Sequence, residues 1–426
     1  MSEASSVRSD IVWVATGQAL SALAMLGMMK VWAVFLDPAE LGLMALVVGV
    51  PSILVGIILQ PLFQAILVGY AAHAHQGNAC TYRKVSGHLV TSRVLRIAVI
   101  IVAVGFPVTW LFDLHWIIPV LIIGLFIAEA VCIFEQMLFA AVRRQREVAI
   151  IVAGNVFFRL LFVWLFLFFH EASAYSAMIG NLVGAFLFVA FMRLRLQLEA
   201  FSATQQVLDS LSDAIEKEIS TIAKPLMPSM VLANLTEMGN RYFIGATLGF
   251  HAAGLFVAAY GFVKRPYGML NNVGEMTMTP ILKSAINSGN SKLIAQTRLH
   301  WIAFTTVLSI LGATLFYLFR EPLVSIFLSN KYASISDMLA GLAVSIAFYN
   351  IANVFNWFSI TLGDSRAVLI NNIVGSTLTV ILTIVLCLTT GLVGAIWALF
   401  IGYGIQLLVS VLTYRANLHR YRLAET

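Results

Sequence analysis

Long apolar runs separated by short polar stretches fill almost the whole chain. Twelve runs are long enough for a membrane-spanning helix, because a hydrocarbon core of about 30 Å takes about 20 residues at a rise of 1.5 Å each. The predicted helices lie near residues 11–36, 41–69, 89–112, 116–141, 148–169, 173–194, 225–249, 252–285, 299–319, 333–362, 367–389 and 392–414. The pattern predicts an all-α integral membrane protein.

Composition narrows the function classes further. Of the 426 residues 60% are apolar and 11% charged, against roughly 25% charged in soluble domains. Little of the chain remains for an extramembrane catalytic domain. The sequence has no GxxxxGK loop followed by Ser or Thr, no HExxH helix and no GxSxG elbow. We therefore expect no enzyme activity, no catalytic residues, no metal site and no cofactor.

The basic residues predict the orientation of the chain. The formal net charge of +6 arises from Lys and Arg at helix ends, which argues against a nucleic-acid partner. Most of these cations flank alternate connections and both termini, whereas the opposite connections hold only Arg320 and Lys331. Because Lys and Arg near helix ends stay in the cytoplasm, both termini are predicted to be cytoplasmic. This arrangement requires an even number of helices.

The halves of the chain are joined by a polar stretch and resemble each other. In residues 196–224 apolar side chains recur at spacings of three, four or seven, which predicts an amphipathic helix on the cytoplasmic membrane surface. A solvated linker without a further role is the alternative. Lys30 aligns with Arg241, and Gly42 with Gly254, at nearly the same offset. We expect parallel repeats: a six-helix bundle at 1–195, the linker, and a second bundle at 225–426.

Three segments carry a family resemblance. They are GQALSALAMLGMMKVWAVFLDPAELGLMAL near the N-terminus, NRYFIGATLGFHAAGLFVAAYGFVKRPYGML in the middle, and GLVGAIWALFIGY near the C-terminus. The chain resembles the polysaccharide-transporter (Wzx-like) branch of the multidrug/oligosaccharidyl-lipid/polysaccharide (MOP) exporter superfamily. The resemblance implies a V-shaped, MATE-like pair of bundles with a cationic cavity.

The same resemblance implies a function. Members of this branch flip undecaprenyl-diphosphate-linked oligosaccharides across the bacterial inner membrane for O-antigen, capsule or exopolysaccharide assembly. The partners it implies are the lipid-linked oligosaccharide, membrane lipids, a polysaccharide polymerase and a chain-length regulator.

Five cations lie within the predicted helices and are the candidate substrate-binding residues. A charge at the bilayer centre costs about 2.5–3.5 kcal/mol on insertion scales, so it normally faces a wet cavity or a partner. Arg offers a planar fork to phosphate oxygens, and Lys a mobile point charge. The candidates are Lys30, Arg159, Arg241, Lys264 and Arg265. Pro266 predicts a kink next to the last two, since proline removes a helix hydrogen bond.

The alternative is that internal carboxylates neutralise these cations. Glu129, Glu135, Glu237 and Glu275 also lie within predicted helices, and Glu237 precedes Arg241 by four residues, the spacing at which helical side chains meet. Desolvation disfavours a charged carboxylate, so a buried Glu can exchange protons as a cavity alternates between two aqueous phases. Glu237 and Glu275 are therefore the candidates for ion coupling. The sequence leaves both roles open.

Polar side chains near the seventh and eighth predicted helices could contact sugar. Amides and aromatic rings suit such ligands, although Asn between helices equally often joins the helices. The candidates are Asn234, Asn240, Asn271, Asn272, Tyr242, Tyr260 and Tyr267. Three histidines, His73, His75 and His88, are expected in a solvated cytoplasmic loop.

Three functions fit this class of protein. The first is a lipid-linked oligosaccharide flippase that works by alternating access. The second is an ion-coupled multidrug exporter of the same superfamily, for which an acidic cavity is expected. The third, a membrane-embedded polymerase or glycosyltransferase, would need a large outer loop, and the predicted outer connections are too short. The intramembrane cations favour the flippase.

Overall fold

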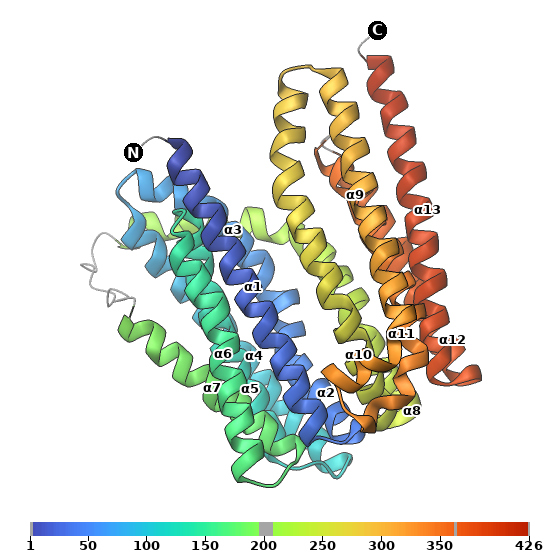
Figure 1. Cartoon of the computed structure of the whole chain (residues 1–426). Helices are drawn as coiled ribbons and strands as arrows, with labels where there is room; N and C mark the ends of the chain where they lie inside the picture. The colour runs from blue at the N-terminus through green and yellow to red at the C-terminus, as the bar shows by residue number, and fades with distance from the viewer. Residues whose placement is uncertain (1–2, 196–207, 362–363, 425–426) are drawn as a thin grey trace. The chain divides into compact units, whose positions relative to one another are not determined.

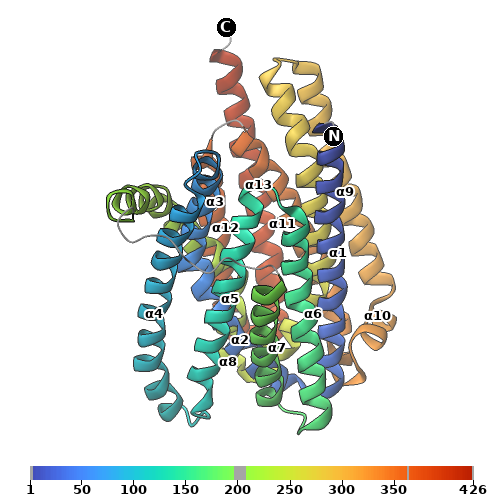
Figure 2. The ribbon, with the colours of Figure 1, turned by 90° about the vertical axis from the view of Figure 1, so that its left-hand side faces the viewer.

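The computed structural model describes the backbone of residues 3–195, 208–361 and 364–424. All regular structure in these ranges is helical (Figures 1 and 2). The helices are α1 (Glu3–Phe35), α2 (Pro38–Leu54), α3 (Gln60–His75), α4 (Ala79–Leu111), α5 (Ile117–Ala141), α6 (Gln145–Phe169), α7 (Ala174–Arg195), α8 (Leu208–Asn287), α9 (Ser291–Leu318), α10 (Arg320–Phe327), α11 (Ser336–Thr361), α12 (Ser365–Thr390) and α13 (Leu392–Ala424). Among the described residues eleven helical stretches are long and apolar enough to cross a membrane. The predicted all-α membrane fold is confirmed.

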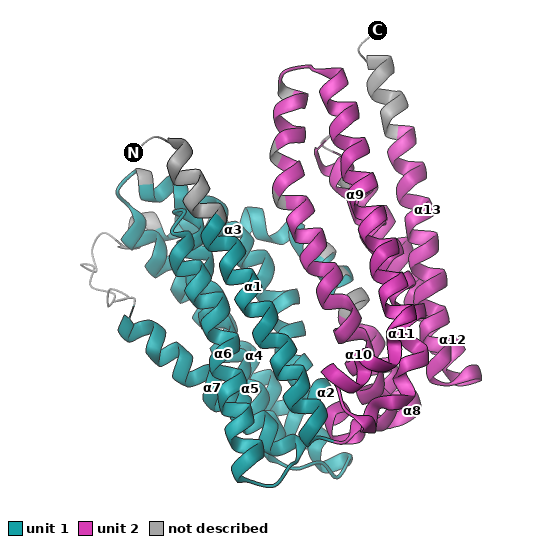
Figure 3. Cartoon of the chain, in the orientation of Figure 1, with its two compact units in different colours: residues 1–36, 44–234 teal, residues 37–43, 235–426 magenta. Residues whose placement is uncertain are grey.

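The chain divides into two compact units (Figure 3). Unit 1 contains Met1–Leu36 and Met44–Asn234, and unit 2 contains Asp37–Leu43 and Leu235–Thr426. The short segment between α1 and the middle of α2 therefore belongs with the C-terminal half of the chain. The chain crosses from unit 1 to unit 2 within α8.

Helix α8 combines two of the predicted membrane helices. One candidate span of 49 residues, Met238–Ile286, covers both. Gly249 interrupts it with φ 82° and ψ 177°, a conformation open to glycine because it has no Cβ atom. This break falls on the last residue of the predicted helix 225–249, just before the predicted helix 252–285. The backbone stays helical through Pro266, where the sequence predicts a kink.

Small residues set the spacing of helices in unit 1. A Cβ atom on Gly17 of α1 would lie 2.7 Å from the Ala149 Cβ of α6, and one on Gly27 would lie 3.3 Å from the Leu160 side chain. A Cβ on Gly184 of α7 would lie 2.8 Å from the Cα of Arg159. Because small residues let helix backbones approach closely in membranes, these glycines bring α1 and α7 onto α6.

The second predicted helix is built from two helices and a wider turn. Pro51 lies inside α2, and Pro61 lies in the first turn of α3. Between them, Val55–Leu59 form a π-helical turn. Proline cannot donate a helix hydrogen bond, so irregular hydrogen bonding is expected next to these residues.

The connection between α3 and α4 is much shorter than the sequence predicts. Helix α3 continues to His75 and α4 begins at Ala79, so only three residues separate them. His73 and His88 therefore lie in helices, not in a solvated loop as predicted. The prediction failed because charged side chains at the start of α4 end the apolar run although the helix continues.

The described part of the linker helix packs on protein. Residues 196–207 lie outside the described part of the chain, and so do the side chains of residues 208–211. Ile215, Ile219 and Ala223 are buried in the same apolar cluster as Leu59 of unit 1. His73 Nε2 lies 3.1 Å from Glu218 Oε2. The apolar face predicted to contact the membrane surface is therefore buried against α3 and α4.

An amide-rich layer joins three helices of unit 2. Asn371 of α12 donates a hydrogen bond of 2.9 Å to the side-chain oxygen of Asn356 in α11. Ser410 of α13 donates to the same oxygen at 3.4 Å. Thr413 of α13 donates to Asn371 Oδ1 at 3.1 Å. Such bonds join helices where apolar contacts give little preference for one packing partner over lipid.

The two glycines paired by the sequence repeat contact each other in unit 2. A Cβ atom on Gly42 would lie 2.9 Å from the Gly254 nitrogen, and one on Gly254 would lie 2.9 Å from the Gly42 nitrogen. Real Cβ atoms do not approach backbone atoms this closely. Both positions therefore require glycine for this packing.

Candidate functional site

Two of the candidate cations, Lys30 and Arg159, belong to unit 1. The Gly17–Ala149 and Gly27–Leu160 contacts fix the register of α1 on α6 and show that the two helices run in the same direction. In this register Lys30 lies about 5 Å along the axis from the level of Arg159, at 1.5 Å per residue. Both side chains are partly buried. Unit 1 thus holds two cations at similar depth.

Arg159 has a hydrogen-bond donor that no described residue uses. Its Nε donates to Asn155 Oδ1 at 3.0 Å, one helical turn earlier. Its Nη2 is buried and has no hydrogen-bond partner among the described residues. A buried, charged N–H group without a partner is costly, so an anion or a water molecule is expected at this nitrogen.

Glu129 of α5 supplies the compensating charge near Arg159. Ser52 Oγ donates to the Glu129 carboxylate, at 3.2 Å from Oε1 and 3.4 Å from Oε2. Arg159 interacts with this carboxylate electrostatically, and no direct ion pair joins the two among the described contacts. The sequence offers Glu129 only as a neutralising group. Ser52 was missed, because a lone Ser in an apolar helix gives no sequence signal.

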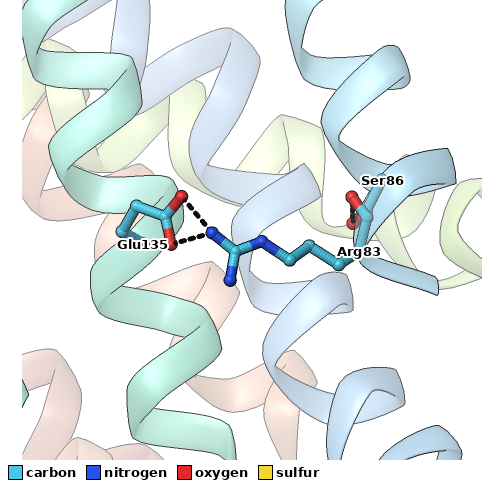
Figure 4. Close-up of polar contacts among 3 residues, drawn as sticks. All are labelled: Arg83, Ser86 and Glu135. Atoms are coloured by element: carbon cyan, nitrogen blue, oxygen red, sulfur yellow. Dashed lines mark hydrogen bonds and ion pairs between the residues drawn. The ribbon is translucent and has the colours of Figure 1, made fainter. Parts of the chain in front are cut away.

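A second carboxylate of α5 is bound directly. Arg83 Nη2 of α4 lies 2.7 Å from Glu135 Oε1 and 2.8 Å from Oε2 (Figure 4). The Glu135 side chain is 8% exposed, and the Arg83 side chain 18%. Ser86 Oγ donates to the Arg83 carbonyl oxygen at 3.1 Å within α4. Arg83 lies between the predicted helices 41–69 and 89–112, but in the structure it belongs to α4 and pairs with a buried acid of α5.

The other three candidate cations, Arg241, Lys264 and Arg265, lie on α8 in unit 2. Arg241 is partly buried, and its Nη2 lies 3.2 Å from Met238 Sδ. The side chain of Glu237 lies outside the described residues, so the predicted Glu237–Arg241 pair stays a prediction. Arg265 is also partly buried.

Lys264 lies beside a tyrosine cluster formed by Tyr260, Tyr349 and Tyr403. Its Nζ is 5.6 Å from the centre of the Tyr260 ring, within the range of a cation–π contact. The Tyr260 and Tyr403 hydroxyl groups are 3.4 Å apart, and the Tyr349 and Tyr403 rings have centroids 5.0 Å apart. This arrangement places a cation next to aromatic faces. A cation can bind phosphate, and an aromatic face can pack against a sugar ring.

Glu275, the second ion-coupling candidate, lies further along α8. It is ten residues beyond Arg265, which is about 15 Å of helix. It is partly buried and forms no hydrogen bond or ion pair within the described residues. Neutralisation of Arg265 by Glu275 is excluded by this separation along one continuous helix.

Two of the proposed sugar-contacting residues have structural partners instead. Asn240 is 4% exposed and accepts a hydrogen bond of 3.2 Å from Thr383 of α12. Tyr267 is 1% exposed, and its hydroxyl donates to the Ser309 carbonyl oxygen of α9 at 2.9 Å. The Asn234 side chain donates to the Met230 carbonyl oxygen at 2.8 Å within α8. Asn240 and Tyr267 therefore join helices, which is the alternative the sequence left open.

The described residues contain no group of three or more His, Cys, Asp or Glu side chains that could hold a metal ion. Each unit instead carries partly buried cations close to neutral hydrogen-bonding or aromatic side chains. This chemistry suits an anionic ligand with polar substituents.

Comparisons with known proteins agree with this fold. Residues 31–337 match the model of a family described as "Polysaccharide biosynthesis protein". A search of curated proteins finds no match.

Solved structures share the fold at low sequence identity. An inward-facing multidrug resistance MATE family transporter of the MOP superfamily has a TM-score of 0.69 at 14% identity, covering 95% of this chain and 96% of its own. A MOP superfamily transporter from Pyrococcus furiosus, whose binding pocket is described as having reverse polarity, has a TM-score of 0.67 at 15% identity, with 97% and 95% covered. A mutant of the Vibrio cholerae MATE transporter VcmN has a TM-score of 0.64 at 16% identity, with 98% of each chain covered.

Proposed function

We propose, from the premise that this chain belongs to the polysaccharide biosynthesis protein family, that it is a flippase for a lipid-linked oligosaccharide. It is a multi-pass membrane protein with the fold of MOP-superfamily transporters. The proposed substrate is an undecaprenyl-diphosphate-linked oligosaccharide. Its head group crosses the bacterial inner membrane by alternating access, for assembly of O-antigen, capsule or exopolysaccharide.

The observation that carries the proposal is the buried hydrogen-bond donor of Arg159 that no described residue uses. Its buried Nη2 has no partner among the described residues, and Lys30 lies at a similar depth in the same unit. A diphosphate group supplies acceptor oxygens for the Arg159 Nη2 donor and negative charge that both cations attract. Arg241, Lys264 and Arg265 of unit 2 are proposed to bind the head group in their own unit during its passage, and the tyrosine cluster near Lys264 is proposed to bind its sugar.

Ion coupling is a separate part of the proposal. Glu237 and Glu275 remain the candidates predicted from the sequence. Glu129 is added to them, because its only direct hydrogen-bond partner among the described residues is the neutral Ser52 hydroxyl. A carboxylate bound by a hydroxyl can take up a proton without breaking an ion pair, whereas Glu135 is already bound by Arg83.

Both termini are proposed to be cytoplasmic, and a polysaccharide polymerase and a chain-length regulator are the proposed partners. A polymerase is expected because a flippase delivers repeat units that another protein must join.

Complementation of surface polysaccharide export tests the proposal. In a strain that lacks its own copy, Arg241→Ala and Arg159→Ala should abolish export while the protein still reaches the membrane. Arg415→Ala is the matched control, because Arg415 is an exposed cation near the end of α13. Arg159→Lys should restore part of the export, since it keeps the charge.

Unchanged export in both Ala variants would contradict the proposed role of these cations.

The second candidate function is an ion-coupled multidrug exporter, which Glu129 favours because a carboxylate attracts cationic compounds. Extrusion of a cationic dye by the wild type, with no change in surface polysaccharide when the gene is removed, would establish that function instead.

A further inference from the structure

Unit 1 contains a cavity that the proposed transport mechanism does not use. Its volume is about 640 Å³, and it lies between α4, α5 and the end of α7. Small-molecule sites generally measure roughly 300–1,000 Å³. The cavity is therefore large enough to hold a small-molecule ligand.

The cavity has a polar end and an apolar end. Lys84 and His88 near the start of α4, and Arg193 near the end of α7, line the polar end. Val94 and Leu95 of α4, with Ile127 of α5, line the other end. Such a division fits an amphiphile, with its charged group among the basic side chains and its chain among the apolar ones.

The length of the cavity matches one leaflet of a bilayer. Lys84 and Leu95 are eleven residues apart on one helix, which corresponds to about 16 Å at 1.5 Å per residue. Half of a hydrocarbon core of about 30 Å is nearly the same distance. The cavity is therefore long enough to hold much of one acyl chain.

The charge at the polar end is positive. The one lining carboxylate, Glu135, is bound by Arg83 at 2.7 Å, so its charge is compensated. Lys84 and Arg193 also line this end, and Arg193 acts electrostatically on Glu135 as well, so cations outnumber the carboxylate there. Basic pockets between membrane helices on the cytoplasmic side bind anionic lipid head groups, and the orientation predicted from the basic residues puts this end on that side.

We propose that this cavity is a binding site for an anionic phospholipid of the membrane. Its phosphate lies between Lys84 and Arg193, and one acyl chain follows α4 toward Leu95. The bound lipid joins α4 to α7 at the end where Arg83 and Glu135 join α4 to α5. The site is distinct from the cations proposed to bind the transported head group.

Native mass spectrometry of the full-length protein in detergent, titrated with lipids, tests the proposal. Dioleoylphosphatidylglycerol should bind at least about tenfold more tightly than dioleoylphosphatidylcholine. The double variant K84Q/R193Q should weaken binding of the anionic lipid about thirtyfold, because each juxtamembrane cation contributes about fivefold toward an anionic surface. The matched control R96Q/R195Q removes two exposed cations of the same helices and should leave binding within twofold.

A second variant tests the chain-binding part. Thr91 is exposed and lines the cavity, so Thr91→Phe should fill it without a change of charge or fold. We expect this variant also to lose binding of the anionic lipid, by at least about tenfold.

Four outcomes would overturn the proposal. The first is equal affinity for the two phospholipids, and the second is a loss of anionic-lipid affinity in R96Q/R195Q equal to that in K84Q/R193Q. The third is binding of glycerol 3-phosphate as tight as that of the lipid. The fourth is that undecaprenyl diphosphate, and not the phospholipid, is the ligand whose binding depends on Lys84 and Arg193. Since no transport is measured, failure of this proposal leaves the proposed function untouched.

Discussion

Separating the Arg83–Glu135 pair should destabilise unit 1 more strongly than any other single polar change in it. The perturbation is Glu135→Leu, which removes the acid and leaves the Arg83 guanidinium between α4 and α5. Breaking a buried ion pair by removal of one partner costs about 3–5 kcal/mol. The Arg83 side chain keeps 18% exposure, so we expect the lower end, a loss of about 3 kcal/mol in the free energy of unfolding.

The opposite perturbation should cost less. Arg83→Met leaves the Glu135 carboxylate, which can take up a proton and become neutral, whereas a guanidinium stays charged. We expect a loss of about 1–2 kcal/mol, the cost of leaving a buried polar group without its partner. The double variant R83M/E135L should lie within about 1 kcal/mol of the wild type, since replacing a buried pair by apolar residues is often neutral. These values give a coupling free energy of at least about 3 kcal/mol.

Reversible unfolding in mixed micelles with a denaturing detergent, followed by circular dichroism, provides the assay. All four proteins of the cycle are measured under one set of conditions. A coupling below about 0.6 kcal/mol, the average for hydrogen bonds between membrane helices, would refute the reasoning. So would a larger loss in Arg83→Met than in Glu135→Leu.

Three further predictions concern packing. Ile219→Asp should detach the linker helix from unit 1, because Ile219 is 0% exposed in an apolar cluster; faster proteolysis between residues 196 and 224 would show it, and an unchanged rate would contradict it. Gly254→Val should abolish the monodisperse protein peak in size-exclusion chromatography, because the valine side chain would overlap the Pro38 carbonyl group. A normal monodisperse peak would disprove this contact. Asn356→Leu should lower the free energy of unfolding by about 1–2 kcal/mol, since Asn371 and Ser410 both donate to it; no change would show that the amide layer is not stabilising.

The fold was largely predictable because its main signal is the length of apolar runs. This signal depends on the thickness of the bilayer and requires no knowledge of tertiary contacts. The boundary between the seventh and eighth predicted helices could also be located, and the structure has its break at Gly249. The glycine pair Gly42 and Gly254 emerged from comparing the two halves of the sequence, although their mutual contact did not.

The errors arose where tertiary contacts override local polarity. Arg83 and Lys84 mark a loop on hydropathy alone, yet α4 includes both, and Glu135 compensates Arg83. The linker helix has the pattern of a membrane-surface helix, and that pattern cannot distinguish lipid from the apolar surface of unit 1. Ile219 packs on protein for this reason.

The candidate site was predictable as a set of residue types but not as a set of contacts. Intramembrane cations are conspicuous in sequence because their insertion is costly. Which of them has a protein partner depends on helix register. The register of α1 on α6 brings Lys30 to the level of Arg159, while Asn240 and Tyr267, equally good candidates in sequence, bind neighbouring helices.

Translocation in proteoliposomes tests the central claim most directly, namely that the intramembrane cations stabilise an anionic head group during its passage. The initial rate is measured for a fluorescent lipid-linked sugar attached through a diphosphate, with the wild type and with Arg159→Gln. We expect a rate at least about tenfold lower in the variant, since one charged hydrogen bond is worth about 1.5–3 kcal/mol. Equal rates for the two proteins would contradict the central claim.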